Sequence, residues 1–71
     1  MDDEQRELEK QKRGLLLTIM QAKFEDKVYA YLDSDKFESM DELDAWLSEA
    51  LQQFCKERRM VREYYNSRIY S

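Results

Sequence analysis

The sequence predicts an all-α fold, in which two antiparallel helices form a hairpin that dimerises into a four-helix bundle. First, its 71 residues include only one Gly and no Pro, so few residues end or break a helix. Second, Ser39-Met40-Asp41-Glu42 is typical of a helix N-terminus. Third, apolar residues recur at intervals of three and four on both sides of that tetrapeptide.

The length and composition are those of one small helical domain, residues 1–71, and they argue against several classes of function. Although 39% of residues are charged, 42% are hydrophobic, including five Tyr, three Phe and one Trp, so we expect a folded chain. The sequence has no His and a single Cys, Cys55, which removes the commonest general base, the commonest zinc ligand and any internal disulfide. We therefore expect no enzyme activity, cofactor or metal.

No apolar run approaches the roughly 20 residues of a membrane span. The longest is Leu15-Leu16-Leu17, and the acidic N-terminal residues carry the wrong charge for a secretory signal. The sequence therefore predicts a cytoplasmic protein with no membrane association.

The first helix is predicted in two parts. Residues 1–14 form a frayed or extended helix, and residues 15–32 form the packed helix. Between them, Gly14 weakens a helix by about 1 kcal/mol relative to Ala and is a candidate kink. The packed part carries an apolar stripe at helical spacing, flanked by Leu16 and Leu32. The stripe comprises Leu17, Met20, Phe24, Val28 and Tyr31.

Residues 27–32 also admit a strand, because Val and Tyr favour β-structure. A strand followed by a Ser-capped helix would give a ribbon-helix-helix arrangement, in which paired strands enter the DNA major groove. However, no Gly or Asn turn divides residues 40–69 into the two helices that this fold needs. The strand would also lie unusually late in the chain, so we favour a helix.

The turn is predicted at residues 33–39. Ser39 is expected to accept a hydrogen bond from the N–H of Glu42, whose carboxylate reaches back to the N–H of Ser39. Phe37 is expected to fold back over the end of the core.

The second helix is predicted at residues 40–69. Its apolar stripe is interrupted at Glu57 and Arg58, where a heptad repeat expects an apolar residue. The stripe comprises Leu43, Leu47, Ala50, Phe54, Val61 and Tyr64, broadened by Trp46, Leu51, Cys55 and Tyr65.

Charge changes sign along this second half. Residues 33–49 carry a net charge of −6 and residues 50–71 carry +3, within a total of −4, which suits the dipole of the second helix. The acids Asp41, Glu42, Asp44 and Glu49 lack a Gly turn or a Glu-x-x-His motif, so solvation of the helix start explains them better than a metal site does. Cys55 is interpreted as a core residue, since no His is present to activate it.

The basic, Tyr-rich end of the second helix is the candidate partner-binding site. Bases interleaved with aromatics suit contacts with nucleic acid. The acidic balance of the whole chain instead favours docking of another protein, for example the acidic region 33–49 of a second copy. The candidate residues are Lys56, Arg59, Arg62, Arg68 and Tyr65.

An isolated hairpin would leave the wide stripe of the second helix partly uncovered, and a second copy is the simplest cover. The expected dimer or core anchors are Trp46, Leu47, Leu51 and Phe54. The sequence thus predicts a small non-enzymatic protein-interaction module, with a small nucleic-acid-binding regulator as the alternative.

Overall fold

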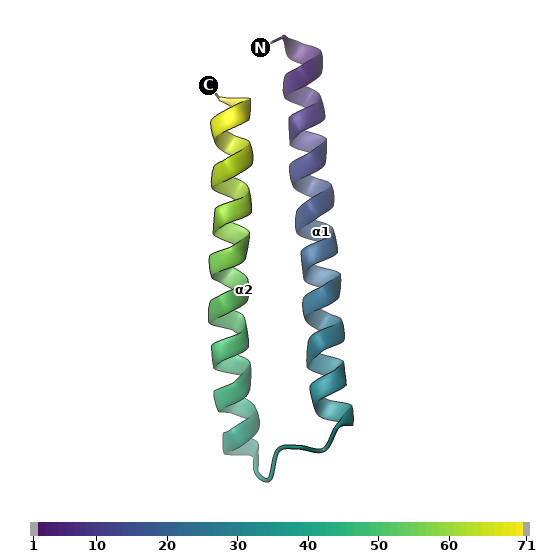
Figure 1. The fold of residues 1–71 in the computed structure, drawn as a ribbon, viewed down its shortest axis with the longest axis vertical. Coiled ribbons are helices and arrows are strands. Elements are labelled where there is room, and N and C mark those ends of the chain that lie inside the picture. Colours follow the sequence, from purple (N-terminus) through teal and green to yellow (C-terminus); the bar gives the residue numbers. More distant parts are fainter. Residues whose placement is uncertain (1, 71) are drawn as a thin grey trace.

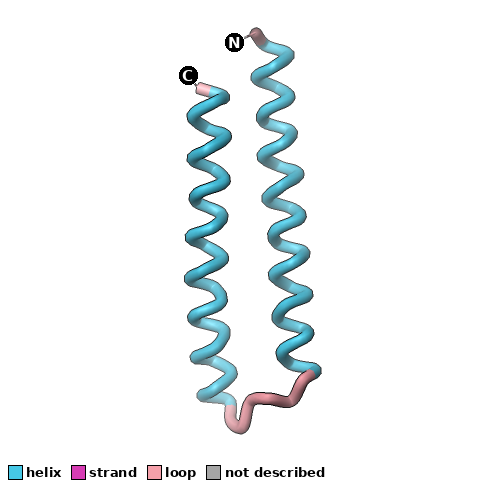
Figure 2. Tube along the Cα trace, in the orientation of Figure 1, coloured by secondary structure: helices cyan, strands magenta, loops and turns pink. Residues whose placement is uncertain are grey.

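The computed structural model describes residues 2–70 as two long helices lying side by side and antiparallel (Figure 1). Helix α1 spans Asp3–Asp33 and helix α2 spans Met40–Ile69, so both chain ends lie at one end of the hairpin. Residues 27–32 belong to α1, and the described part of the chain contains no strand (Figure 2). The predicted all-α hairpin is therefore confirmed.

Side chains cap the start of both helices, as short polar residues preceding a helix do. Asp2 Oδ1 accepts a hydrogen bond from the N–H of Gln5 at 2.8 Å, and Ser39 Oγ accepts one from the N–H of Glu42 at 3.2 Å. The reciprocal half of the predicted capping box is wrong. The Glu42 carboxylate accepts from the N–H of Glu38 at 2.7 Å instead of from Ser39, because the turn brings that donor over the first turn of α2.

The connection between the helices depends on one left-handed residue. Asp35 has φ of 53°, a conformation that Asp tolerates better than most side chains. The N–H of Ser34 still donates to Ala30 O at 3.1 Å, and that of Asp35 to Leu32 O at 3.4 Å. These two bonds satisfy carbonyls at the end of α1 while the chain reverses direction.

Helix α1 continues without interruption through Gly14, the position where a kink was considered. Thr18 Oγ1 donates to Gly14 O at 2.9 Å, so the carbonyl of the glycine has a local side-chain partner. The helix also begins at Asp3, well before the packed segment that the apolar stripe defines.

The facing residues follow an 11-residue repeat rather than a heptad. On α2, the buried or half-buried Leu43, Phe54 and Tyr65 recur at intervals of 11, and Leu47 and Arg58 are likewise 11 apart. Arg58 is thus at a facing position, with its guanidinium carbon 5.7 Å from the centre of the Phe54 ring. The stripe looks broken at Glu57 and Arg58 only when a seven-residue repeat is assumed.

An 11-residue repeat corresponds to about 3.67 residues per turn and imposes no left-handed supercoil. The two helices accordingly run side by side along their whole length (Figure 1). On α1 the same repeat places Arg6, Leu17 and Val28 at equivalent facing positions, all of them half-buried.

Aromatic stacking closes the hairpin near the turn. Tyr31 stacks on Trp46 with ring centres 4.1 Å apart, and Phe37 lies 5.9 Å from Tyr31, as expected of a side chain covering the core. Further along, Phe24 stacks on Phe54 at 4.5 Å. These contacts form the apolar half of the interface, and such pairs add stabilisation beyond the area they bury.

The hairpin is one helix layer thick and exposes an unusual amount of surface. Its extents are 54 × 17 × 10 Å, and its radius of gyration is 16.4 Å, against about 11 Å for a compact chain of this length. The accessible surface is 5738 Å², whereas a compact 8.7 kDa protein exposes about 4,700 Å². Roughly 1,000 Å² is thus exposed beyond the usual value for this mass.

Candidate interaction surfaces

A buried carboxylate joins the helices near the chain ends. Glu9 is only 6% exposed and accepts hydrogen bonds from Arg68 Nε at 3.2 Å and from Lys12 Nζ at 3.4 Å. Burial raises the pKa of Glu9, but the hydrogen bonds and positive charges of Arg68 and Lys12 outweigh it, so the pKa lies below its ordinary value. The same pairing, chiefly the hydrogen bond to Glu9, raises the pKa of Arg68. Glu9 is therefore ionised at neutral pH and connects α1 to α2.

Two further polar contacts close this end. Arg6 Nε donates to Ile69 O at 3.1 Å, and Arg13 Nη1 donates to Asn66 Oδ1. The Ile69 side chain is fully buried. Sequence reasoning missed these residues because it ended the packed stripe at Leu17. Counting back by 11 from the apolar facing positions would have found them.

The structure places the five predicted partner-binding residues in different surroundings. Arg59 and Arg62 line a shallow groove of about 300 Å³ with Arg58, whereas Lys56 borders a different hollow beside Glu49. The other two lie elsewhere. Arg68 is bound to Glu9 and also donates to Tyr64 Oη at 3.2 Å, and Tyr65 is half-buried beside Leu15 and Leu16 of α1.

The four predicted anchors occupy two different environments. Phe54 is buried, and Trp46 and Leu47 are half-buried. Leu51, however, is 46% exposed. Cys55, interpreted from the sequence as a core residue, is exposed as well, because the 11-residue repeat turns both residues away from α1. The core interpretation of Cys55 is wrong.

One flat side of the hairpin carries two grooves between the helices. The first, which we call the apolar groove, has a volume of about 220 Å³ and lies nearer the chain ends. It is lined by Lys12, Leu15, Leu16, Ile19 and Tyr65. Leu8 precedes Leu15 by seven residues, two helical turns, and so extends this surface along α1.

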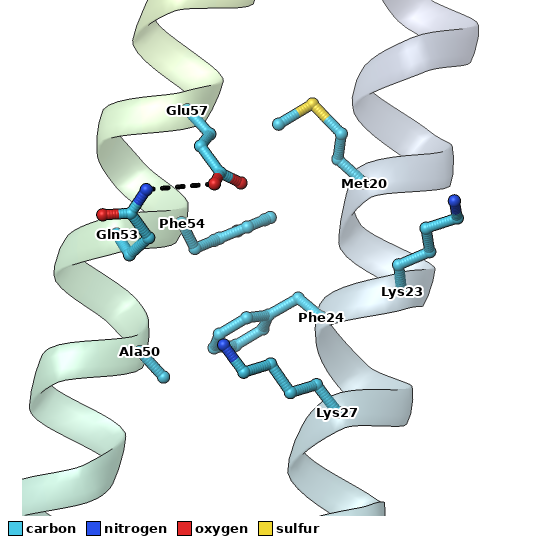
Figure 3. A pocket seen from close by; sticks show the side chains of 8 residues that line it. All are labelled: Met20, Lys23, Phe24, Lys27, Ala50, Gln53, Phe54 and Glu57. Atoms are coloured by element: carbon cyan, nitrogen blue, oxygen red, sulfur yellow. Dashed lines mark hydrogen bonds between the residues drawn. The ribbon is translucent and has the colours of Figure 1, made fainter.

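The second groove, the central groove, has a volume of about 200 Å³ and lies over the stacked Phe24 and Phe54 (Figure 3). Lys23 and Lys27 border it on α1, and Gln53 and Glu57 border it on α2, where Gln53 Nε2 donates to Glu57 Oε1 at 3.1 Å (Figure 3). Met20 and Ala50 complete its lining.

Both grooves lie on the same side of the molecule. Lys12 of the apolar groove and Lys23 of the central groove are 11 residues apart and so occupy equivalent positions of the repeat. We call this side the grooved face. It combines an apolar strip near the chain ends with charged walls nearer the middle.

Neither α1 nor α2 is long and apolar enough to cross a membrane. Within residues 2–70, Cys, Asp and Glu side chains form no group of three or more arranged to hold a metal ion. No protein-family model, curated protein or solved structure matches this chain.

Proposed function

We propose that this chain is a non-enzymatic protein-interaction module that self-associates through the grooved face into a four-helix bundle. The observation that carries the proposal is the surplus of accessible surface, about 1,000 Å² over a compact protein of this mass. A standard protein–protein interface covers about 800 Å² on each partner, so the surplus is about what one such interface would remove.

Apolar side chains of the grooved face support this reading. Leu8 is 49% exposed, Leu15 64% and Ile19 42%, and they line up along one side of α1. Contiguous exposed apolar surface of this kind marks a protein interaction site more often than isolated exposed residues do. Burial of apolar area is the main favourable term in such association.

Sedimentation of the protein over a range of micromolar concentrations tests the proposal. We expect a dimer, which Leu15→Gln combined with Ile19→Gln weakens by at least tenfold. Leu51→Gln is the control, because Leu51 is 46% exposed, between Ile19 and Leu15, yet lines neither groove. A wild-type protein that remains a folded monomer refutes self-association, and equal loss with Leu51→Gln refutes the grooved face.

A nucleic-acid-binding regulator is the second candidate, favoured by the three guanidinium groups of Arg58, Arg59 and Arg62 around one groove. The side chains of Arg59 and Arg62 make no hydrogen bond or ion pair with another described residue. Binding of mixed-sequence DNA that weakens linearly with the logarithm of salt concentration, and disappears with Arg59→Glu plus Arg62→Glu, would support it. The net charge of −4 disfavours it.

A further inference from the structure

We propose that the grooved face takes a second copy of this chain in one orientation, with the two turns at the same end. The twofold axis then runs parallel to the helices, and α1 of each hairpin lies against α2 of the other. This inference rests on the proposed self-association and specifies its geometry.

The walls of the central groove are complementary to each other in charge. The α1 wall carries Lys23 and Lys27, and the α2 wall carries Glu57 and the neutral Gln53 (Figure 3). Glu49 and Lys56 both border the neighbouring hollow with Gln53, so their charges offset each other there and Glu57 sets the sign of this wall. A twofold rotation about an axis parallel to the helices exchanges the walls, so Lys23 of each copy meets Glu57 of the other, twice per dimer, while Lys27 meets the neutral Gln53.

The apolar strip also matches under this rotation. Met60 and Tyr64 follow Glu57 at intervals of three and four, so they continue the same wall of α2 toward the chain ends. Both are more than half exposed. The rotation preserves height along the hairpin. It therefore brings Leu15 and Ile19 of one copy toward Met60 and Tyr64 of the other, since Tyr65 already lies at the height of Leu15.

The opposite orientation, with turns at opposite ends, places like charges together. In that orientation the twofold axis is perpendicular to the helices. Helix α1 of one copy then lies against α1 of the other copy and runs in the opposite direction. Lys12 and Lys23 lie about equally far on either side of the middle of α1, so each would meet the other from the partner copy. Like charges placed opposite each other destabilise an interface and discriminate against that arrangement.

The size of the face suits a dimer. Its extents of 54 Å by 17 Å correspond to a projected area of about 900 Å². That matches the roughly 800 Å² per partner of standard interfaces. A second copy is therefore large enough to cover both grooves at once.

Two single charge reversals test the geometry. In Lys23→Glu, each dimer would oppose acid with acid, and in Glu57→Lys it would oppose base with base. We expect each variant alone to associate about 10- to 100-fold more weakly than wild type, because two attractive charge pairs in each dimer are replaced by two repulsive ones. Mixing the two variants in equal amounts restores both opposite-charge pairs, so we expect the mixture to recover dimer formation.

The mixture distinguishes contacts between copies from contacts within one copy. Any effect within a variant chain is the same whether that variant is alone or mixed, so mixing can restore only contacts between copies. Both substituted residues are exposed, and circular dichroism verifies that the variants remain folded. Recovery in the mixture supports the proposal. Dimers that form normally in both single variants, or that do not recover on mixing, overturn it while leaving self-association itself intact.

Orientation is measured with a spin label at the turn, using Ser34→Cys in a Cys55→Ser background. We expect a short label-to-label distance, because the two turns lie together. A distance close to the 54 Å length of the hairpin shows turns at opposite ends and overturns the proposal. A monomer at every concentration instead removes the proposed self-association and this geometry with it.

Discussion

At the scale of single residues, the two helix-start side chains and the buried Glu9 define the hairpin most sharply. The caps satisfy backbone donors that have no partner inside their helix. Glu9 instead connects two segments of the chain that are 59 residues apart in sequence. Local residues thus set where the helices begin, and a long-range ion pair aligns their far ends.

Ser39→Ala should destabilise the protein by about 1 kcal/mol, because the N–H of Glu42 loses its acceptor. Urea denaturation measures the change. Ser48→Ala is the control, since Ser48 is exposed within α2, where Ala is the better helix former. Equal stability of wild type and Ser39→Ala would contradict the role of the cap.

Lowering the pH should loosen the end of the hairpin that holds Glu9. The pKa of Glu9 is lower in the folded state than in the unfolded chain. Its ionisation therefore contributes stability above the ordinary glutamate pKa, and this contribution is lost as pH falls through the depressed folded value.

Comparison of melting temperatures at neutral and acidic pH tests this effect. Glu9→Gln should lower the melting temperature at neutral pH and reduce its further decrease in acid. Glu7→Gln is the matched control on the same helix, because Glu7 is exposed. Identical pH profiles for wild type and Glu9→Gln would show that the ion pair with Arg68 does not stabilise the fold.

At the scale of elements, both helices are long, and packing rather than intrinsic propensity selects the sides that face each other. The 11-residue repeat explains why Arg58 faces α1 and why Leu51 does not. The interface changes along its length, from stacked aromatics near the turn to ion pairs and hydrogen bonds near the chain ends.

Gly14→Ala should stabilise the protein by about 1 kcal/mol, because α1 is continuous there and a methyl group at Gly14 would meet nothing within 4 Å beyond its chain neighbours and the backbone of its own helix. Ala22→Gly, at another exposed position of the same helix, should destabilise by a similar amount. Chemical denaturation measures both. A destabilising Gly14→Ala would mean that the helix is not continuous at this position in solution.

At the scale of the whole molecule, a single layer of two helices cannot enclose a core. Only four apolar side chains are buried among the described residues: Leu43, Ala50, Phe54 and Ile69. The stacked Phe24 and Phe54 still border an open groove. Further cover over the grooved face would therefore add stability that the isolated hairpin lacks.

The melting temperature should consequently rise with protein concentration, because association stabilises the folded state by mass action. Calorimetry at several concentrations over about two orders of magnitude measures the shift. Leu15→Gln with Ile19→Gln should remove the dependence, since these residues line the apolar groove. A melting temperature independent of concentration in the wild type would contradict the proposed self-association.

The sequence by itself determined the all-α class, the cap at Ser39, the turn, and most of the apolar stripe from Leu17 to Tyr31. These features depend on interactions within a few residues, so local spacing and side-chain chemistry reveal them. Even Phe37 was placed correctly, because a lone aromatic beside a tight turn has only the adjacent core to cover.

Only the tertiary structure decided which polar residues join the helices and which exposed residues share a face. Arg6, Glu9 and Arg13 look like solvated charges until α2 supplies Ile69, Arg68 and Asn66 as their partners. The grooved face likewise combines residues from two helices whose relative height is fixed by the turn and the stacked aromatics. The physical reason is that cross-helix contacts depend on the alignment of both helices, which no local pattern in either one specifies.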